Sequence, residues 1–61
     1  MPSLIGLTGP RAEAALLAAG LDSDGAILVD RDRDPHVVYS QSIVPGTLVL
    51  RGTVVRWRRN P

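Results

Sequence analysis

The chain has 61 residues, with seven basic and six acidic side chains and a formal net charge of +1. Folded domains usually contain about 50–200 residues, so the sequence predicts a single small domain over residues 1–61, with a thin core. Cysteine is absent, which excludes disulfides and cysteine-based metal or redox sites. No apolar run reaches the roughly 18 residues of a membrane span, so no segment is expected to insert into a membrane.

The first part of the chain predicts an apolar lead-in followed by a helix. Residues 2–7 are too few for a helix and are expected to form a brief edge strand or an extended lead-in. Thr8 is a suitable N-cap, and residues 11–19 (RAEAALLAA) have a near-ideal helix composition. Gly20 can take the positive φ that ends a helix. One apolar stripe at helical spacing predicts close packing on a sheet: Ala12, Ala15, Leu16 and Ala19.

The middle of the chain predicts short strands separated by turns. Residues 22–25 favour a turn because Asp, Ser and Gly are turn formers, and residues 26–29 are a compact β-rich run. A charged turn is expected at residues 30–35 and a strand at residues 36–42. In residues 44–47 the central Pro-Gly pair favours a type II turn.

The last strand is predicted over residues 53–58. Its sequence, TVVRWR, alternates, which places Val55 and Trp57 on one face and Arg56 and Arg58 on the other. The two residues at the carboxyl end are expected to fray. The order is therefore a lead-in, a helix and then two or three strands. This order predicts an α+β domain in which one helix packs on a three-stranded, mainly antiparallel sheet.

Five short motifs follow one another between residues 2 and 57. They are Leu4-Ile5-Gly6-Leu7-Thr8; Ala12 with Leu16 and Ala19-Gly20-Leu21; Val38 with Gln41-Ser42; Pro45-Gly46-Thr47; and Gly52-Thr53-Val54-Val55. This series resembles the PASTA domain, a module appended to penicillin-binding proteins and to bacterial membrane Ser/Thr kinases. The chain departs from the family pattern at Ile43, where a proline is usual, and at Trp57, where a smaller aliphatic residue is usual.

The resemblance implies both a fold and a role. Members of the family fold as a helix packed on a small sheet, in the order β-α-β-β, and lie outside the cytoplasmic membrane. They are generally proposed to bind peptidoglycan fragments or β-lactam-like molecules, or to position the parent protein. We therefore expect a non-catalytic, extracytoplasmic cell-wall module of a penicillin-binding protein (a peptidoglycan synthase), with no cofactor. The alternatives are a sensor module of a bacterial Ser/Thr kinase and a structural spacer or docking module without a ligand.

The candidate contact residues lie where arginine gathers, since four of the seven arginines fall in the last eleven residues. Guanidinium groups form bidentate pairs with carboxylates and phosphates. Stem peptides of peptidoglycan carry carboxylates, and teichoic acids carry phosphates. Tyr39 and Gln41 share a strand face that looks outward if Val38 points inward. Five residues are the expected contacts for peptidoglycan fragments or anionic wall polymer: Tyr39, Gln41, Arg51, Arg56 and Arg58. In the alternative interpretation, these arginines only keep an edge strand soluble.

Other partner and site classes find little support in the sequence. A nucleic-acid binder that uses the Arg-rich end is disfavoured by the net charge of +1 and by the low aromatic content. The acidic residues do not make a calcium loop of the EF-hand type, which needs Gly at its sixth position and Glu at its twelfth. When Asp30 stands first, these positions hold Pro35 and Gln41. No metal site is expected.

Catalysis is not expected either, so no catalytic residue is assigned. His36 is the one histidine and could serve as a base for Ser40 or Ser42 on the same strand face. However, no third group is placed to orient the histidine, and no oxyanion hole can be named. An exposed Trp57 could stack on a sugar, but its alternation with Val55 favours core packing.

Overall fold

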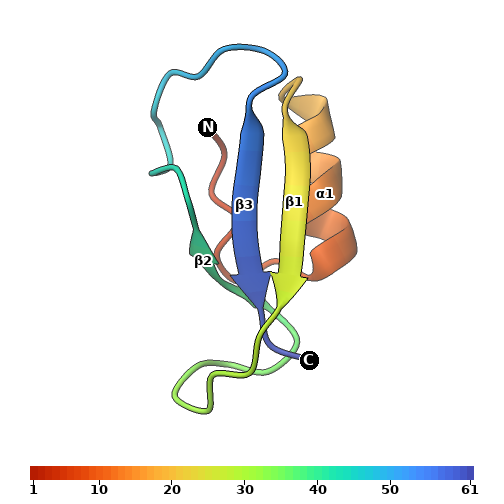
Figure 1. The fold of residues 1–61 in the computed structure, drawn as a ribbon, viewed down its shortest axis with the longest axis vertical. Helices are drawn as coiled ribbons and strands as arrows, with labels where there is room; N and C mark the ends of the chain where they lie inside the picture. Colours follow the sequence, from red (N-terminus) through yellow and green to blue (C-terminus); the bar gives the residue numbers. More distant parts are fainter.

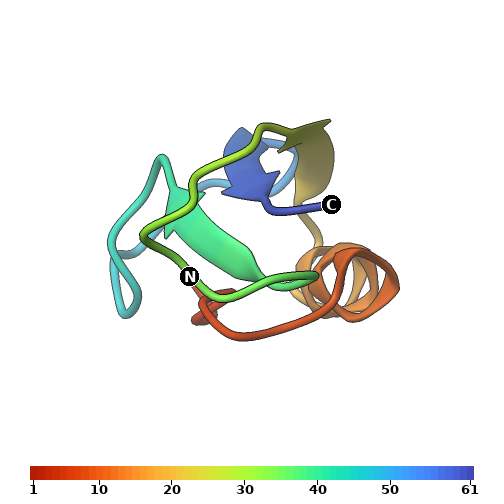
Figure 2. The same ribbon diagram turned by 90° about the horizontal axis from the view of Figure 1, so that it is seen from below.

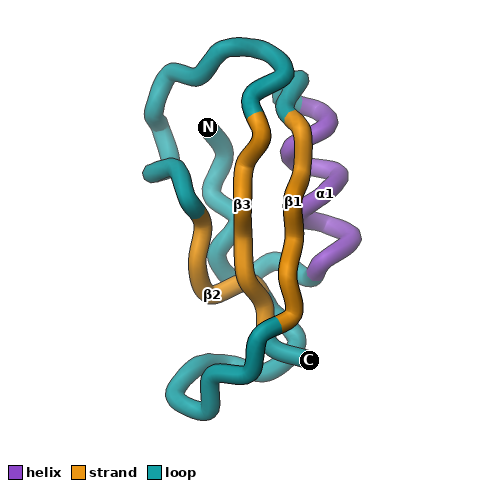
Figure 3. The backbone as a smooth tube through the Cα atoms, viewed as in Figure 1, coloured by secondary structure: helices purple, strands orange, loops and turns teal.

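The computed structural model describes residues 1–61 as one helix and a three-stranded sheet (Figure 1). In chain order these are helix α1 (Gly9–Ala18) and strands β1 (Asp22–Ile27), β2 (Val38–Gln41) and β3 (Val54–Arg59). Loops join β1 to β2 and β2 to β3, as the tube in Figure 3 shows. The expected α+β class, with one helix packed on three strands, is confirmed.

Strand β3 is the centre of the sheet, which has the order β1-β3-β2. β1 runs parallel to β3, in a register that pairs Gly25 with Trp57, and β2 runs antiparallel to β3. A bulge between Val38 and Ser40 shifts the register of β2. β2 and its two loops bring the chain back to the end of the sheet where β1 begins, so β3 starts there and runs parallel to β1. β2 runs in the opposite direction, and the sheet is therefore mixed.

The lead-in runs beside β2 without joining the sheet as a strand. The amide of Gly6 donates to the carbonyl of Val38 at 2.9 Å, and the amide of Val38 donates to the carbonyl of Leu7 at 2.8 Å. Gly6 has a φ of +86°, which turns the chain out of the extended conformation that a strand requires. The segment is therefore a lead-in with a turn at residues 5–6 and not an edge strand, so all three strands follow the helix.

Helix α1 begins at Gly9, directly after the predicted N-cap position, and has Pro10 in its first turn. Thr8 is the N-cap residue, but its hydroxyl makes no capping hydrogen bond. Gly20 has the positive φ predicted for the end of the helix, +75°. The amide of Leu21 then donates to the carbonyl of Leu16 at 2.9 Å, which closes the carboxyl end of the helix.

Helix α1 and the lead-in lie on the same side of the sheet (Figure 2). A small apolar core fills the space between them and the inner face of the sheet. From the predicted stripe, Ala12 and Leu16 are fully buried whereas Ala19 is exposed. Val55 and Trp57 are buried on the inner face, as their alternation predicted. The full core set is Leu4, Ala12, Leu16, Leu21, Val38, Val55 and Trp57.

The turn predicted for residues 22–25 is wrong, because these residues form the first part of β1. All six residues of β1 pair with β3. These tertiary hydrogen bonds outweigh the local turn preference of Asp, Ser and Gly. Gly25 has a specific role in the pairing: a Cβ at this position would collide with the indole of Trp57.

The carboxyl end, predicted to fray, is instead held by Asn60, which is 5% exposed. Its Oδ1 accepts a hydrogen bond from the amide of Asp30 at 2.7 Å. Its Nδ2 donates to the carbonyls of Asp30, Arg33 and Asp34 at 2.9–3.3 Å. One side chain therefore holds the charged loop between β1 and β2 in place, and this long-range function has no signature in the local sequence.

Candidate functional site

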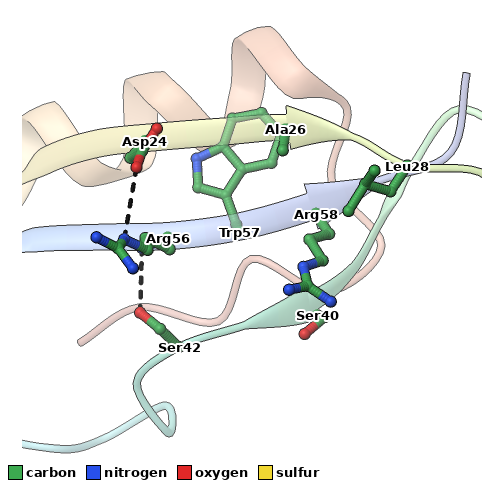
Figure 4. A pocket seen from close by; sticks show the side chains of 8 residues that line it. All are labelled: Asp24, Ala26, Leu28, Ser40, Ser42, Arg56, Trp57 and Arg58. Carbon is green, nitrogen blue, oxygen red and sulfur yellow. Dashed lines mark hydrogen bonds and ion pairs between the residues drawn. The ribbon is translucent and has the colours of Figure 1, made fainter.

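The outer face of the sheet, opposite α1, carries a shallow open basin with a volume of about 500 Å³ (Figure 4). Side chains from all three strands and from the residues that follow β1 and β2 surround it. We call it the outer basin, and its lining residues are Asp24, Ala26, Leu28, Ser40, Ser42, Arg56, Trp57 and Arg58. No helix or loop of the chain fills it, so the basin is open to solvent.

The alternation of β3 places both arginines of this strand in the outer basin. Arg56 and Arg58 are exposed, while Val55 before them and Trp57 between them point to the core. Hydrogen bonds fix the facing end of β2: the amide of Ser42 donates to the carbonyl of Arg56 at 2.8 Å, and the amide of Arg56 donates to Oγ of Ser42 at 3.0 Å. The cationic groups are thus held on a paired strand rather than on a loop.

The two arginines differ in their partners. Nε of Arg56 lies 3.5 Å from Oδ2 of Asp24, and both side chains are largely exposed. An exposed pair of this kind contributes little to stability, so a ligand can compete for either group. Arg58 forms no ion pair. Its side chain extends toward β2 beside Ser40 (Figure 4), so a cation and a hydroxyl donor lie next to each other.

Gln41, expected to face outward with Tyr39, is turned inward. Its Oε1 accepts a hydrogen bond from the amide of Leu4 at 2.8 Å, and its Nε2 donates to the carbonyl of Ile43 at 2.6 Å and approaches that of Pro2 at 3.4 Å. The bulge in β2 explains the difference, because it places Ser40 on the outer face and Gln41 on the inner one. Gln41 therefore fastens the lead-in to β2 and does not reach the outer basin.

Tyr39 and Arg51 also lie away from the outer basin. Tyr39 is half-buried, and its hydroxyl donates to the carbonyl of Leu28 at 3.0 Å. This hydrogen bond joins the two ends of the loop between β1 and β2. Arg51 lies against Gly20 at the carboxyl end of α1, where a cation complements the partial negative charge of the helix terminus. Of the five candidate contacts, only Arg56 and Arg58 come together.

Three polar residues of the outer basin were missed by the sequence reasoning. Ser40 and Ser42 share a strand face by period-two alternation. The sequence shows this alternation, but it was considered only for a catalytic role with His36. Asp24 was missed because its segment was assigned to a turn. Once residues 22–27 are placed in a strand, alternation alone brings Asp24 and Ala26 to the same face.

The residues considered for metal binding or catalysis are dispersed. No group of three or more His, Cys, Asp or Glu side chains comes together in the chain. His36 lies in the loop before β2 with a φ of +67°, so it does not share a strand face with Ser40 or Ser42. The one helix has ten residues, and no helix of the structure has the length and apolar character that crossing a bilayer requires.

No protein-family model, no curated protein and no solved structure matches this chain. The geometry of the outer basin and the chemistry of its side chains are therefore the observations that bear on function.

Proposed function

We propose that the chain is a PASTA-like, non-catalytic module that lies outside the cytoplasmic membrane and binds peptidoglycan fragments weakly through the outer basin. The motifs behind the resemblance have definite structural functions, which supports the fold part of the proposal. Leu4 and Leu16 belong to the core, and Gly20 and Gly46 adopt positive φ at turns. Gln41 fastens the lead-in.

The observation that carries the binding proposal is the open position of Arg58. Its guanidinium is exposed, has no carboxylate partner and lies on a sheet face that the chain leaves uncovered. Arg56 is one alternation away on the same strand, and its exposed pair with Asp24 can be exchanged for a ligand. Two guanidinium groups on one face suit a ligand with carboxylates, such as a stem peptide of peptidoglycan.

The affinity is expected to be low. The outer basin is shallow, and its charged groups stay in contact with water. Tight binding depends on a few anchors that are fully desolvated, and this face offers none, so we expect a dissociation constant of about micromolar or weaker. Such an affinity is adequate for a module that meets its ligand as a dense polymer, where many binding sites act together.

The binding proposal is tested by NMR titration of the isotope-labelled chain with a soluble muropeptide. Shifts are expected at the amides of Ser40, Ser42, Arg56 and Arg58, and Arg58→Gln should abolish them. Arg11→Gln is the matched control, because Arg11 is an exposed arginine of α1 on the opposite side of the sheet. If millimolar muropeptide shifts none of the outer-basin amides, the binding proposal is wrong and the ligand-free spacer or docking module takes its place.

The proposed parent is a penicillin-binding protein, with a Ser/Thr kinase as the alternative. This choice comes from the sequence resemblance alone and has its own test. The gene that encodes these residues should also encode a transpeptidase domain, and the protein should be found with the cell envelope after fractionation. A kinase domain in the same gene would assign the module to a sensor instead.

A further inference from the structure

Strand β1 has an unpaired edge along its whole length. The amide of Asp22 donates to the carbonyl of Thr53, and the amide of Leu28 donates to the carbonyl of Arg59, both at 3.0 Å. Backbone groups alternate in direction along a strand, so the even-numbered residues of β1 face β3. The N–H and C=O groups of Ser23, Gly25 and Ile27 therefore point to the open side. All three residues are exposed, and no bulge, lysine or proline protects this edge.

A groove lies beside this edge, between β1 and the amino-terminal half of α1. It has a volume of about 240 Å³, and its lining residues are Gly9, Pro10, Glu13, Gly25, Ala26, Ile27, Trp57 and Arg59. Gly9 and Gly25 lack side chains at the points where a Cβ would approach the ring of Trp57. Trp57 is only 5% exposed, so just the edge of its indole reaches the groove, where it forms part of the floor. A hydrogen bond of 2.9 Å from its Nε1 to Oγ of Ser23 fixes the orientation of the ring.

The groove also holds two charges of opposite sign. Glu13 projects from α1, and Arg59 reaches the groove from the end of β3, where its Nε lies near Gly9. Neither side chain forms an ion pair within the chain. Arg59 lies at the Ile27 end of the strand because these two residues are register partners. Glu13 lies nearer to Gly25 because α1 and β1 run in opposite directions (Figure 1).

We propose that an extended peptide segment of a partner binds in this groove as a fourth strand beside β1. Its backbone forms the hydrogen bonds that the edge lacks, and a small apolar side chain rests on Trp57. An acidic residue of the peptide lies near Arg59 and a basic residue near Glu13. A polypeptide is the occupant because only a peptide backbone repeats donors and acceptors at the spacing of a strand edge. This site lies on a different face from the outer basin and goes beyond the function proposed above.

The test uses two synthetic peptides with opposite charge order, Ac-Lys-Thr-Val-Thr-Asp-NH2 and Ac-Asp-Thr-Val-Thr-Lys-NH2. Two orders are needed because the peptide can run parallel or antiparallel to β1, and only one order then matches Arg59 and Glu13. NMR titration of the labelled chain should give shifts at Ser23, Gly25 and Ile27. The amides of these residues should also gain protection from hydrogen exchange. The preferred peptide should bind several-fold more tightly than the other, and Glu13→Lys should remove this preference.

A backbone control leaves the protein unchanged. N-methylation of the preferred peptide at a residue that faces β1 removes a donor, and binding should weaken about tenfold. N-methylation at the next residue, which faces away, should have little effect. The proposal is overturned if millimolar peptide shifts none of the three edge amides or if the two methylated peptides bind equally. It is also overturned if the edge amides shift with protein concentration alone, which would assign the edge to a second copy of the chain.

Discussion

The indole of Trp57 packs directly against the backbone of Gly25, its register partner on the neighbouring parallel strand. This contact lets the largest side chain of the chain lie flat beneath β1 and reach the edge of the sheet. It also explains why a glycine stands in the middle of a six-residue strand, where glycine is ordinarily unfavourable.

The first prediction follows from this contact. Gly25→Ala adds a Cβ into the space of the Trp57 ring and should destabilise the domain by about 1–3 kcal/mol, as overpacked cores do. Urea denaturation of both chains measures the difference. The control is a double-mutant cycle with Trp57→Leu, in which a smaller side chain leaves room for the new methyl group. A penalty that is the same in the Trp57→Leu background would show that the indole is not its cause.

A second prediction concerns the loop between β1 and β2. Asn60→Ala removes the acceptor for the amide of Asp30 and the donor for three carbonyls, so the free energy of unfolding should fall by about 2 kcal/mol. Thermal unfolding measures the loss, and hydrogen exchange should locate it at Asp30. Removal of the exposed Pro61 is the control and should change little. An equal loss from both variants would mean that the chain end acts only by its length.

A third prediction concerns Gln41, which the sequence placed among the ligand contacts. Gln41→Ala should lower the free energy of unfolding by about 1–2 kcal/mol, because the part-buried amide of Leu4 loses its acceptor. Hydrogen exchange at Leu4 should accelerate, while muropeptide binding at the outer basin should stay the same. If binding is lost and stability is kept, Gln41 is a ligand contact after all.

The sequence predicts the parts of this fold that depend on local pattern, and it misses those that depend on distant partners. Helix α1 and the inward face of β3 follow from periodicity, and both are confirmed. β1 has a turn-like composition and becomes a strand only because β3 lies beside it. The buried state of Asn60 depends on a loop 26–30 residues away in sequence. No window of neighbouring residues contains that information.

The same distinction applies to the candidate site. Arg56 and Arg58 are two residues apart on one strand, so alternation alone places them together. Gln41 also lies on a predicted strand, but a bulge before it reverses its direction, and a single extra residue is enough to do so. The contribution of Asp24 could be found only once β1 was known to pair with β3.

The fourth prediction separates the stability of the outer basin from its binding. Asp24→Asn removes the exposed partner of Arg56, which should change the free energy of unfolding by no more than about 0.5 kcal/mol. The same change frees the guanidinium of Arg56 and removes a negative charge that repels carboxylates. Affinity for a muropeptide should therefore rise, as measured by NMR titration. Asp32→Asn is the matched control, because Asp32 is an exposed acid in the loop between β1 and β2. If Asp24→Asn weakens binding, Asp24 contacts a cationic group of the ligand and the outer basin recognises more than carboxylates.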